Sequence, residues 1–429
     1  MRTALTAADL AAIDAHLRQT DDLLGTAYPG DDGSRQPVHT VYVPADRYAP
    51  ELATVWGRAA LASVDAAGGI EALAVSVGLD EELAAAIAPR VREKLEREPI
   101  EDLRIDFEDG YGDRGDDVED AEAVRAAKRV AAAEGAQFAP PFIGIRFKSF
   151  EAATRARGIR TLDLFVTALV EHGGLPDGLA LTLPKVSTVA QVEAMADAAA
   201  ALEHALGLPA RRLRFEVQVE TPQLILGADG RSPVARLPLA APGRISGLHY
   251  GTYDYSASLQ IAAPYQSMEH PSADLAKGIM QLAVAGTGIR LSDGSTNLLP
   301  IGDRAAEAWR LHARLVRRSL ERGIYQGWDL HANQLPTRYI ATYAFYREGY
   351  PAASARLRDH RTHTTGAVLD EPATVRALAG FVLRGVRCGA ISASEVRADT
   401  GIDEPALVAL AHPGAAALST THPNHQETT

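Results

Sequence analysis

Five consecutive short apolar segments of the sequence end in ionisable residues. The segments are LRIDFEDGYG (103–112), FIGIRFKS (142–149), LALTLPKV (179–186), RFEVQVET (214–221) and ISGLHYGTYD (245–254). If each segment is a β-strand, alternate side chains point to the same face. The ionisable residues that this parity carries toward the strand ends are Asp106, Glu108, Arg146, Lys185, Glu220 and Asp254.

These residue types in this order favour one kind of chemistry. Taken singly, a carboxylate at a strand end is more often a solvated loop residue or a helix cap than a ligand. Five neighbouring strands that each deliver a charge to the same edge are much harder to explain as surface residues. Two carboxylates from adjacent strands, with Arg and Lys beside them, suit a hard divalent cation and an anionic substrate.

The elements that would position these residues form a repeating pattern. Three further apolar segments, HTVYVPA (39–45), GIRLSDG (288–294) and GWDLHANQ (327–334), bring the number of expected strands to eight. Ala-rich segments of helical pattern lie between them, at 51–66, 116–134, 162–172, 188–206, 271–285 and 303–323. Eight strands alternating with helices predict an α/β protein, a (β/α)8 TIM barrel whose catalytic mouth lies at the carboxyl ends of the strands.

Segments outside the repeat extend this barrel at both ends. We expect an N-terminal helical extension over 1–37, a barrel over 38–336 with a helical insertion at about 68–99, and a C-terminal helical lid or oligomerisation segment over 337–419. Within that last segment we expect a loop at 359–366 and a second helical unit at 371–387. The polar tail, 420–429, is expected to fray.

Composition excludes several classes of protein. The 429 residues are 46% hydrophobic and carry a net charge of −12, with a pI of about 5.6, so neither nucleic acid nor an anionic membrane is an expected partner. The single cysteine, Cys388, can form no intramolecular disulfide. No apolar stretch has the length of a membrane span and no signal peptide is recognisable, so we expect a cytoplasmic protein.

The ordered motifs VYVPA, IDFEDG, IRFKS, LPKV, QVETP, GLHYGTYDYSAS and DLHANQ resemble the HpcH/HpaI aldolase and citrate lyase beta-subunit family. That family includes malyl-CoA and citramalyl-CoA lyases, which are phosphoenolpyruvate/pyruvate-type barrels. The resemblance covers about residues 38–390. It implies a Mg²⁺-dependent barrel, with Mn²⁺ as a possible substitute, that is assembled as trimers or hexamers.

The resemblance also implies roles for individual residues. Glu220 and Asp254 match the two metal carboxylates, and Arg146 matches the arginine that binds a substrate carboxylate and stabilises an enolate. Glu108 and Asp109 match an acidic pair that orients this arginine and the metal waters. The other expected substrate-binding residues are Lys185 of LPKV, a rim lysine, and Asp106.

Asp370, in GAVLDEP, resembles a lid aspartate that reaches the site of a neighbouring subunit. The alternative is structural, because Asp directly before a helix with Pro in its first turn is a common N-cap. As a lid residue Asp370 would transfer a proton, whereas as a cap it would only stabilise its helix.

The activity that follows is carbon–carbon bond cleavage or formation through an enolate, on a 2-oxo or hydroxy acid or a hydroxyacyl-CoA. The family's Arg-Ser before the first strand is here Val38-His39, and its His-Pro-x-Gln is here His331-Ala332-Asn333-Gln334, so free acids remain possible substrates. Two alternatives stay open. One is a hydroxyacyl-CoA thioesterase on the same scaffold, and the other is a non-catalytic protein that binds an acyl group or dicarboxylate.

Overall fold

Eight parallel strands form a nearly closed barrel in the computed structural model, which describes residues 3–133, 135, 139–362 and 371–414. The strands are β1 His39–Pro44, β2 Asp102–Asp106, β3 Phe142–Arg146, β4 Leu179–Leu183, β5 Phe215–Val219, β6 Ile245–Tyr250, β7 Arg290–Ser292 and β8 Gly327–Asp329. Continuous pairing runs β7-β6-β5-β4-β3-β2-β1-β8. Between β7 and β8 the ring is closed by a bridge from Ser292 to Gln326 and by a 2.8 Å hydrogen bond from the Asp293 N–H to the Gln326 carbonyl.

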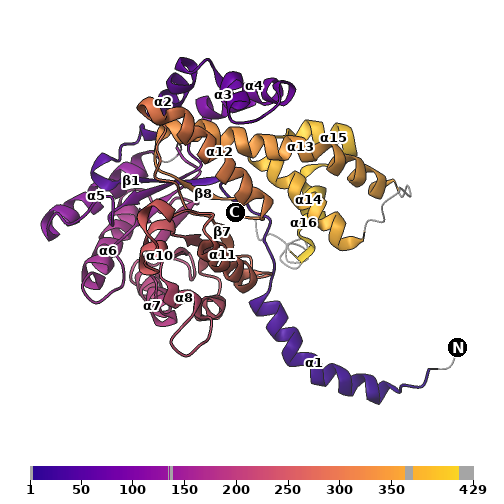
Figure 1. The fold of residues 1–429 in the computed structure, drawn as a ribbon. Helices are drawn as coiled ribbons and strands as arrows, with labels where there is room; N and C mark the ends of the chain where they lie inside the picture. The colour runs from indigo at the N-terminus through magenta and orange to yellow at the C-terminus, as the bar shows by residue number, and fades with distance from the viewer. Residues whose placement is uncertain (1–2, 134, 136–138, 363–370, 415–429) are drawn as a thin grey trace, which may run out of the picture.

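Helices surround the barrel as the repeat predicts (Figure 1). They are α2 Leu52–Ala66, α5 Asp116–Ala133, α6 Arg155–His172, α7 Val189–Ala205, α8 Pro222–Ile225, α9 Leu237–Ala240, α10 Thr252–Ser258, α11 Pro271–Val284 and α12 Ala305–Glu321. Each of the eight expected segments contains one of the strands, so the (β/α)8 barrel is confirmed.

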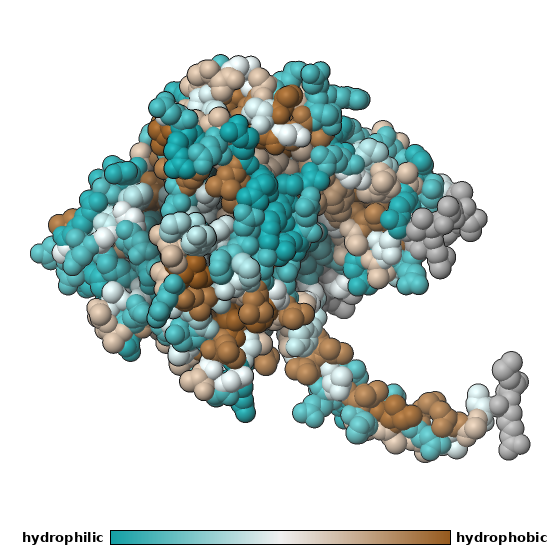
Figure 2. All heavy atoms as spheres, viewed as in Figure 1, coloured by the Kyte–Doolittle hydropathy of each residue, from teal (hydrophilic) through white to brown (hydrophobic). Residues whose placement is uncertain are grey.

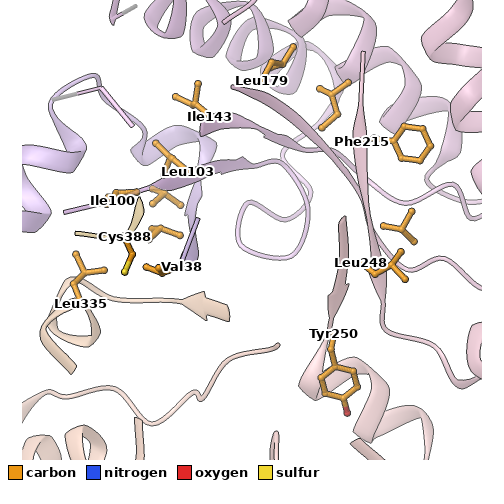
Figure 3. Packing of buried hydrophobic residues seen from close by; sticks show 14 of the residues in the cluster. Val38, Ile100, Leu103, Ile143, Leu179, Phe215, Leu248, Tyr250, Leu335 and Cys388 are labelled. Carbon is orange, nitrogen blue, oxygen red and sulfur yellow. The ribbon is translucent and has the colours of Figure 1, made fainter. Parts of the chain in front are cut away.

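The two faces of the strands carry different residues. Figure 3 shows Leu103, Ile143, Leu179, Phe215 and Leu248 within one buried apolar cluster, and these side chains form the layer that the helices cover. Burial of such side chains is the main favourable term in folding.

The other face, inside the barrel, is polar. Arg104 is fully buried, donates a hydrogen bond of 2.9 Å to Thr182 Oγ1, and forms ion pairs with Asp102 and Glu216. His249 Nε2 lies 3.2 Å from Glu216 Oε1. Buried charges are tolerated when they are paired and hydrogen-bonded, as they are here.

Further helices cover one flank of the barrel. The expected insertion contains α3 Ile70–Ser76 and α4 Glu81–Arg97, and α4 packs against α13 Leu335–Arg361. The chain then continues with α14 Pro372–Arg387, α15 Ala393–Thr400 and α16 Glu404–Ala411. Helix α13 extends to Arg361, so the loop that was expected to begin at residue 359 begins later, because the helical hydrogen bonds continue through that residue.

The end of α14 lies at the amino end of the first strand. The Tyr343 hydroxyl donates a 2.8 Å hydrogen bond to the Cys388 carbonyl, and Figure 3 shows Cys388 beside Val38, which precedes β1. Cys388, directly after α14, therefore packs at the end of the barrel opposite to the carboxyl ends of the strands, whereas α13 begins close to the carboxyl end of β8.

Two features concern single helices. Helix α1, Ala7–Ala27, extends away from the body of the molecule and has no buried residue (Figure 1). Within the described ranges no single helix is long and apolar enough to cross a membrane. Only α2 and α3 together pass that test of length and composition, and they are bent by 70° relative to one another.

A single carboxylate joins the closing strand to its surroundings. Asp329 of β8 is fully buried and accepts hydrogen bonds from His39 Nδ1 of β1 at 2.8 Å, from His312 Nε2 of α12 at 2.9 Å and from the Arg338 guanidinium of α13 at 2.9 Å. Burial alone would raise the pKa of Asp329, but the charge of Arg338 and the hydrogen bonds from both histidines hold it well below its usual value. Asp329 therefore stays ionised and fixes four elements together.

We predict that Asp329→Asn lowers the free energy of unfolding by about 3–5 kcal/mol, because it leaves the buried Arg338 without its counter-ion. Urea unfolding followed by circular dichroism measures this change. Asp359→Asn, near the C-terminal end of α13 where the side chain is 44% exposed, serves as the control and should lie within about 0.5 kcal/mol of wild type. Equal stability of the two variants would contradict a structural role for Asp329.

Candidate active site at the carboxyl ends of the strands

The charged residues singled out in the sequence meet at one end of the barrel. They come from five consecutive strands, β2 to β6, and from the loops and the helix that directly follow them. Their places are Asp106 and Arg146 as the last residues of β2 and β3, Glu108 and Asp109 after β2, Lys185 after β4, Glu220 after β5, and Asp254 in the first turn of α10.

Arg146 is locked in place by Asp106. The Arg146 Nε and Nη2 atoms each donate a hydrogen bond of 2.7 Å, to Asp106 Oδ1 and Oδ2 respectively. The same two oxygens accept the backbone N–H groups of Glu108 at 3.0 Å and Gly110 at 2.8 Å. The Asp106 carboxylate, expected to bind substrate, thus directs its hydrogen bonds to the protein and orients the arginine, a role that the sequence analysis gave to Glu108 and Asp109.

Two further residues that the sequence analysis did not select also hold Arg146. The Tyr42 ring lies 4.8 Å from the guanidinium carbon, and Gln218 Oε1 accepts from Nη1 at 3.5 Å. Gln218 Nε2 in turn donates to the Tyr42 hydroxyl at 3.0 Å. Gln218 shares strand parity with Glu220, which is the signal that would have placed it beneath the rim.

Lys185 lies at the centre of the carboxylates. Its ammonium pairs with Glu108, lies 2.8 Å from Asp109 Oδ1 and 3.6 Å from Asp254 Oδ2. Its backbone has a positive φ of 51°, uncommon for a residue other than glycine, and its N–H donates to Glu220 Oε2 at 3.0 Å. Of the expected acidic pair, Asp109 therefore contacts Lys185. Glu108 also approaches Arg146, with 3.3 Å between Glu108 Oε2 and Arg146 Nη1.

Glu220 is buried in an environment that disfavours its charge. Burial raises its pKa to about 8, and the negative charges of Glu108 and Asp254 add to the shift against the opposing charge of Arg146. The backbone of Gly251 packs tightly on this side chain, since a Cβ at Gly251 would lie 2.2 Å from Glu220 Cγ. The neighbouring Glu108 Oε2 is buried without a hydrogen-bond partner.

The charge balance of the site fits a divalent cation. Five carboxylates (Asp106, Glu108, Asp109, Glu220 and Asp254) face two cationic groups, Arg146 and Lys185, so acidic groups exceed basic ones by three. Buried carboxylate oxygens are the ligands that Mg²⁺ prefers, and Mg²⁺ is usually held by one or two of them with waters and substrate oxygens. Within the described residues no group of three His, Cys, Asp or Glu side chains is arranged to hold a metal ion.

Asp370 lies outside the described residues. Helix α14 begins at Pro372, and the residue at its N-cap position is Glu371, so the expected cap position is shifted by one residue. The Glu371 side chain makes no capping hydrogen bond to the helix.

Comparison with known proteins supports the barrel and places the chain in a family. The family described as "Domain of unknown function (DUF6986)" matches residues 17–414, and this chain belongs to it. No curated protein matches the sequence. Among solved structures, a citrate lyase from Burkholderia xenovorans LB400 has a TM-score of 0.54 and 18% identity over 88% of this chain and 97% of that one.

Two other solved structures match at lower similarity. A Haloferax volcanii malate synthase in a magnesium/glyoxylate complex has a TM-score of 0.47 and 16% identity, over 88% of this chain and 97% of that chain. The protein CitE from Mycobacterium tuberculosis, in complex with magnesium and acetate, has a TM-score of 0.44 and 18% identity, over 82% and 98%. The resemblance indicated by the ordered motifs is confirmed at the level of the fold, which the Burkholderia citrate lyase shares.

The raised pKa of Glu220 predicts a pH-dependent stability in metal-free protein. The folded chain keeps this proton up to about pH 8, whereas an unfolded glutamate loses it near pH 4.5, so ionisation of Glu220 opposes folding as the pH rises. Between these values the contribution of Glu220 to the free energy of unfolding should fall by about 1.4 kcal/mol per pH unit.

Glu220→Gln should remove this slope, so that the variant gains stability relative to wild type as the pH is raised from 5 to 8. Urea unfolding at a series of pH values, in the presence of a chelator, measures the difference. Glu307→Gln, at an exposed position of α12, is the control, and its free energy of unfolding should change with pH as that of wild type does over this range. Parallel curves for wild type and Glu220→Gln would show that Glu220 is ionised in the folded protein.

Proposed function

We propose that this protein is a metal-dependent carbon–carbon lyase or aldolase that acts through an enolate on a 2-oxo acid, a hydroxy acid or a hydroxyacyl-CoA. The observation that carries the proposal is the meeting of an immobilised arginine, Arg146, with the buried Glu220 and with Asp254 at the mouth of one barrel. This combination places fixed positive charge beside carboxylate oxygens that could hold a metal ion. A site that only binds an anion would not need these carboxylates.

Glu220 and Asp254 would hold Mg²⁺ or Mn²⁺, which when bound would act as a Lewis acid on the carbonyl oxygen of a 2-oxo acid. Glu220 is held from two sides, by the Lys185 N–H and by the backbone of Gly251. These contacts fix the carboxylate before any ligand binds, and such preorganisation is what a reactive site requires.

Arg146 would stabilise the negative charge that develops when the carbon–carbon bond breaks. Its guanidinium is held by Asp106 and Tyr42, so little reorganisation is needed when that charge forms. In comparable sites a donor of this kind contributes about 3–4 kcal/mol to the stabilisation of the transition state.

The Lys185 cluster would serve substrate binding. Lys185, paired with Glu108 and Asp109, lies at the entrance to the site, where a substrate carboxylate could exchange with one of these acidic partners. Burial disfavours the Lys185 charge, but the neighbouring carboxylates outweigh it and raise the pKa, so the side chain remains a cation at neutral pH.

A lid role for Asp370 would require a neighbouring subunit. Cys388, directly after α14, packs at the amino end of β1 in its own chain, opposite the proposed site. In a trimer or hexamer, Asp370 of one chain would enter the site of another.

A screen of 2-oxo acids, hydroxy acids and hydroxyacyl thioesters with and without Mg²⁺ tests the proposed reaction, with release of an oxo acid as the readout. A lyase releases an oxo acid from a hydroxyacyl thioester, whereas a thioesterase releases the intact hydroxy acid. Binding without turnover of any of these compounds would instead support a non-catalytic acyl-binding protein.

For the metal site, we predict that Glu220→Gln and Asp254→Asn each weaken Mn²⁺ binding by at least tenfold, about 1.4 kcal/mol, because each removes one charged ligand. Titration calorimetry or Mn²⁺ electron paramagnetic resonance measures this without any activity assay. Glu307→Gln again provides the control. Unchanged Mn²⁺ affinity in both site variants would remove this assignment.

For the arginine, we predict that Arg146→Lys lowers kcat/KM by at least tenfold, about 1.4 kcal/mol. An ammonium cannot form the two parallel hydrogen bonds to Asp106 that fix the guanidinium. Wild-type kinetics in this variant, measured with the substrate found in the screen, would show that Arg146 has a structural role only.

A further inference from the structure

Helix α1 is an amphipathic helix, and none of its residues is buried against the part of the chain that the structure describes. Leu10, Ile13, Leu17 and Leu24 recur at spacings of three, four and seven residues, which brings them to one side of a helix. All four side chains are exposed, and the helix extends from the body of the molecule (Figure 1).

The sequence nevertheless specifies this helix strongly. Thr6 and Asp9 form a reciprocal capping box that fixes its first residue. Most of the stability of a helix in a protein comes from packing of its apolar side rather than from intrinsic propensity. A capped helix with an uncovered apolar stripe therefore implies a surface that covers it.

The segment that follows α1 is held against the end of α11 and the start of β7. The Gly30 N–H donates a 2.7 Å hydrogen bond to the Gly286 carbonyl, and Arg290 donates to the carbonyls of Ser34 at 2.7 Å and Arg35 at 2.6 Å. A side chain at Gly288 would meet the Gly30 carbonyl at 2.6 Å, so the two segments lie in close contact. These contacts hold the segment after α1 against the barrel while the helix itself points outward.

A matching apolar surface lies on the flank where α1 is rooted. Four leucines of α11 and of the segment from α8 to α9 are exposed. They are Leu226 (64% exposed), Leu239 (62%), Leu275 (63%) and Leu282 (81%), and we call them the α8–α11 patch. Helix α11 contacts α8 and the single turn Pro233–Arg236 that precedes α9. Figure 2 shows hydrophobic atoms gathered over this part of the surface.

The charges around the two surfaces are complementary. Helix α1 contains four Asp and one Arg, a net charge of −3, and Asp14 and Asp21 border its apolar stripe. The α8–α11 patch is bordered by the exposed Arg231 and Arg236. The Arg236 side chain forms no hydrogen bond or ion pair with any residue that the structure describes, and Arg231 Nε lies 3.8 Å from the exposed Asp229.

We propose that α1 of one chain packs against the α8–α11 patch of a second copy of this chain. The leucine stripe would cover the exposed leucines, and Asp14 and Asp21 would approach Arg231 and Arg236. The partner is a second copy because the chain itself carries both complementary surfaces and leaves both exposed. The proposal concerns assembly and does not depend on the proposed reaction.

Site-directed cross-linking tests the proposed contact. Full-length chains with Leu17→Cys and chains with Leu282→Cys, carrying different tags, are co-expressed and oxidised. The native Cys388 is buried and burial raises its pKa to about 12, so it does not interfere. We expect a disulfide between the differently tagged chains, and none when Leu282→Cys is replaced by Val55→Cys on the exposed side of α2.

Three other cross-linking results would each overturn the proposal. A Leu17–Leu17 disulfide would mean that two α1 helices pair with each other. In a variant that carries both Leu17→Cys and Leu282→Cys, a disulfide that forms only within one chain would mean that α1 folds back on its own α11. The absence of any cross-link, with the chain monomeric by light scattering at its 45.6 kDa mass, would mean that α1 has no such partner.

A charge exchange tests the specific orientation. Asp14→Lys with Asp21→Lys should weaken association at least tenfold in sedimentation or light scattering, and adding Arg231→Glu with Arg236→Glu should restore it. Each double variant should keep the wild-type circular dichroism, since all four residues are exposed. Failure of the combined variant to recover association would exclude the proposed contact between these charges.

Discussion

The fold depends on one buried carboxylate at the point where the barrel closes. Asp329 of β8 binds His39 of β1, His312 of α12 and Arg338 of α13, so the last strand, the first strand and two helices share one anion. Pairing between β7 and β8 is limited to a bridge and adjoining hydrogen bonds, so the position of β8 depends on its contacts with β1, α12 and α13. The rim at the carboxyl ends of β2 to β6 can then be built from charged residues, because the geometry of the barrel is fixed by contacts elsewhere.

At the rim the charges are reversed, because single cations are held there by several carboxylates. Each cation is surrounded by more than one carboxylate, and Glu220 adapts by a raised pKa. Both carboxylate oxygens of Asp106 accept hydrogen bonds from Arg146, while Glu108 lies between Arg146 and Lys185. This division of contacts explains how a crowded acidic site remains folded, and it leaves the proposed ligands Glu220 and Asp254 with the least compensation from the protein.

The sequence predicted the barrel and the residues of its rim because strand parity and the end of each apolar segment are local properties. Parity also places Gln218 on the same face as Glu220, although Gln218 was not predicted as a site residue. The partners of individual side chains were not predictable in this way. That Asp106 rather than Asp109 binds Arg146 depends on the conformation of the loop after β2, where two backbone N–H groups orient the carboxylate. The position of the C-terminal helices depends on contacts between residues far apart in sequence, such as Tyr339 with Pro99.

The polar interior of the barrel constrains how this sequence can change over time. Arg104, Asp102, Glu216 and His249 balance one another in a space where barrels usually pack branched apolar residues. Loss of any one member leaves an uncompensated charge among the others. Substitutions at these positions are therefore epistatic: a change at one is tolerated only in backgrounds where another has already changed, and relatives should differ here in coordinated sets rather than at single sites.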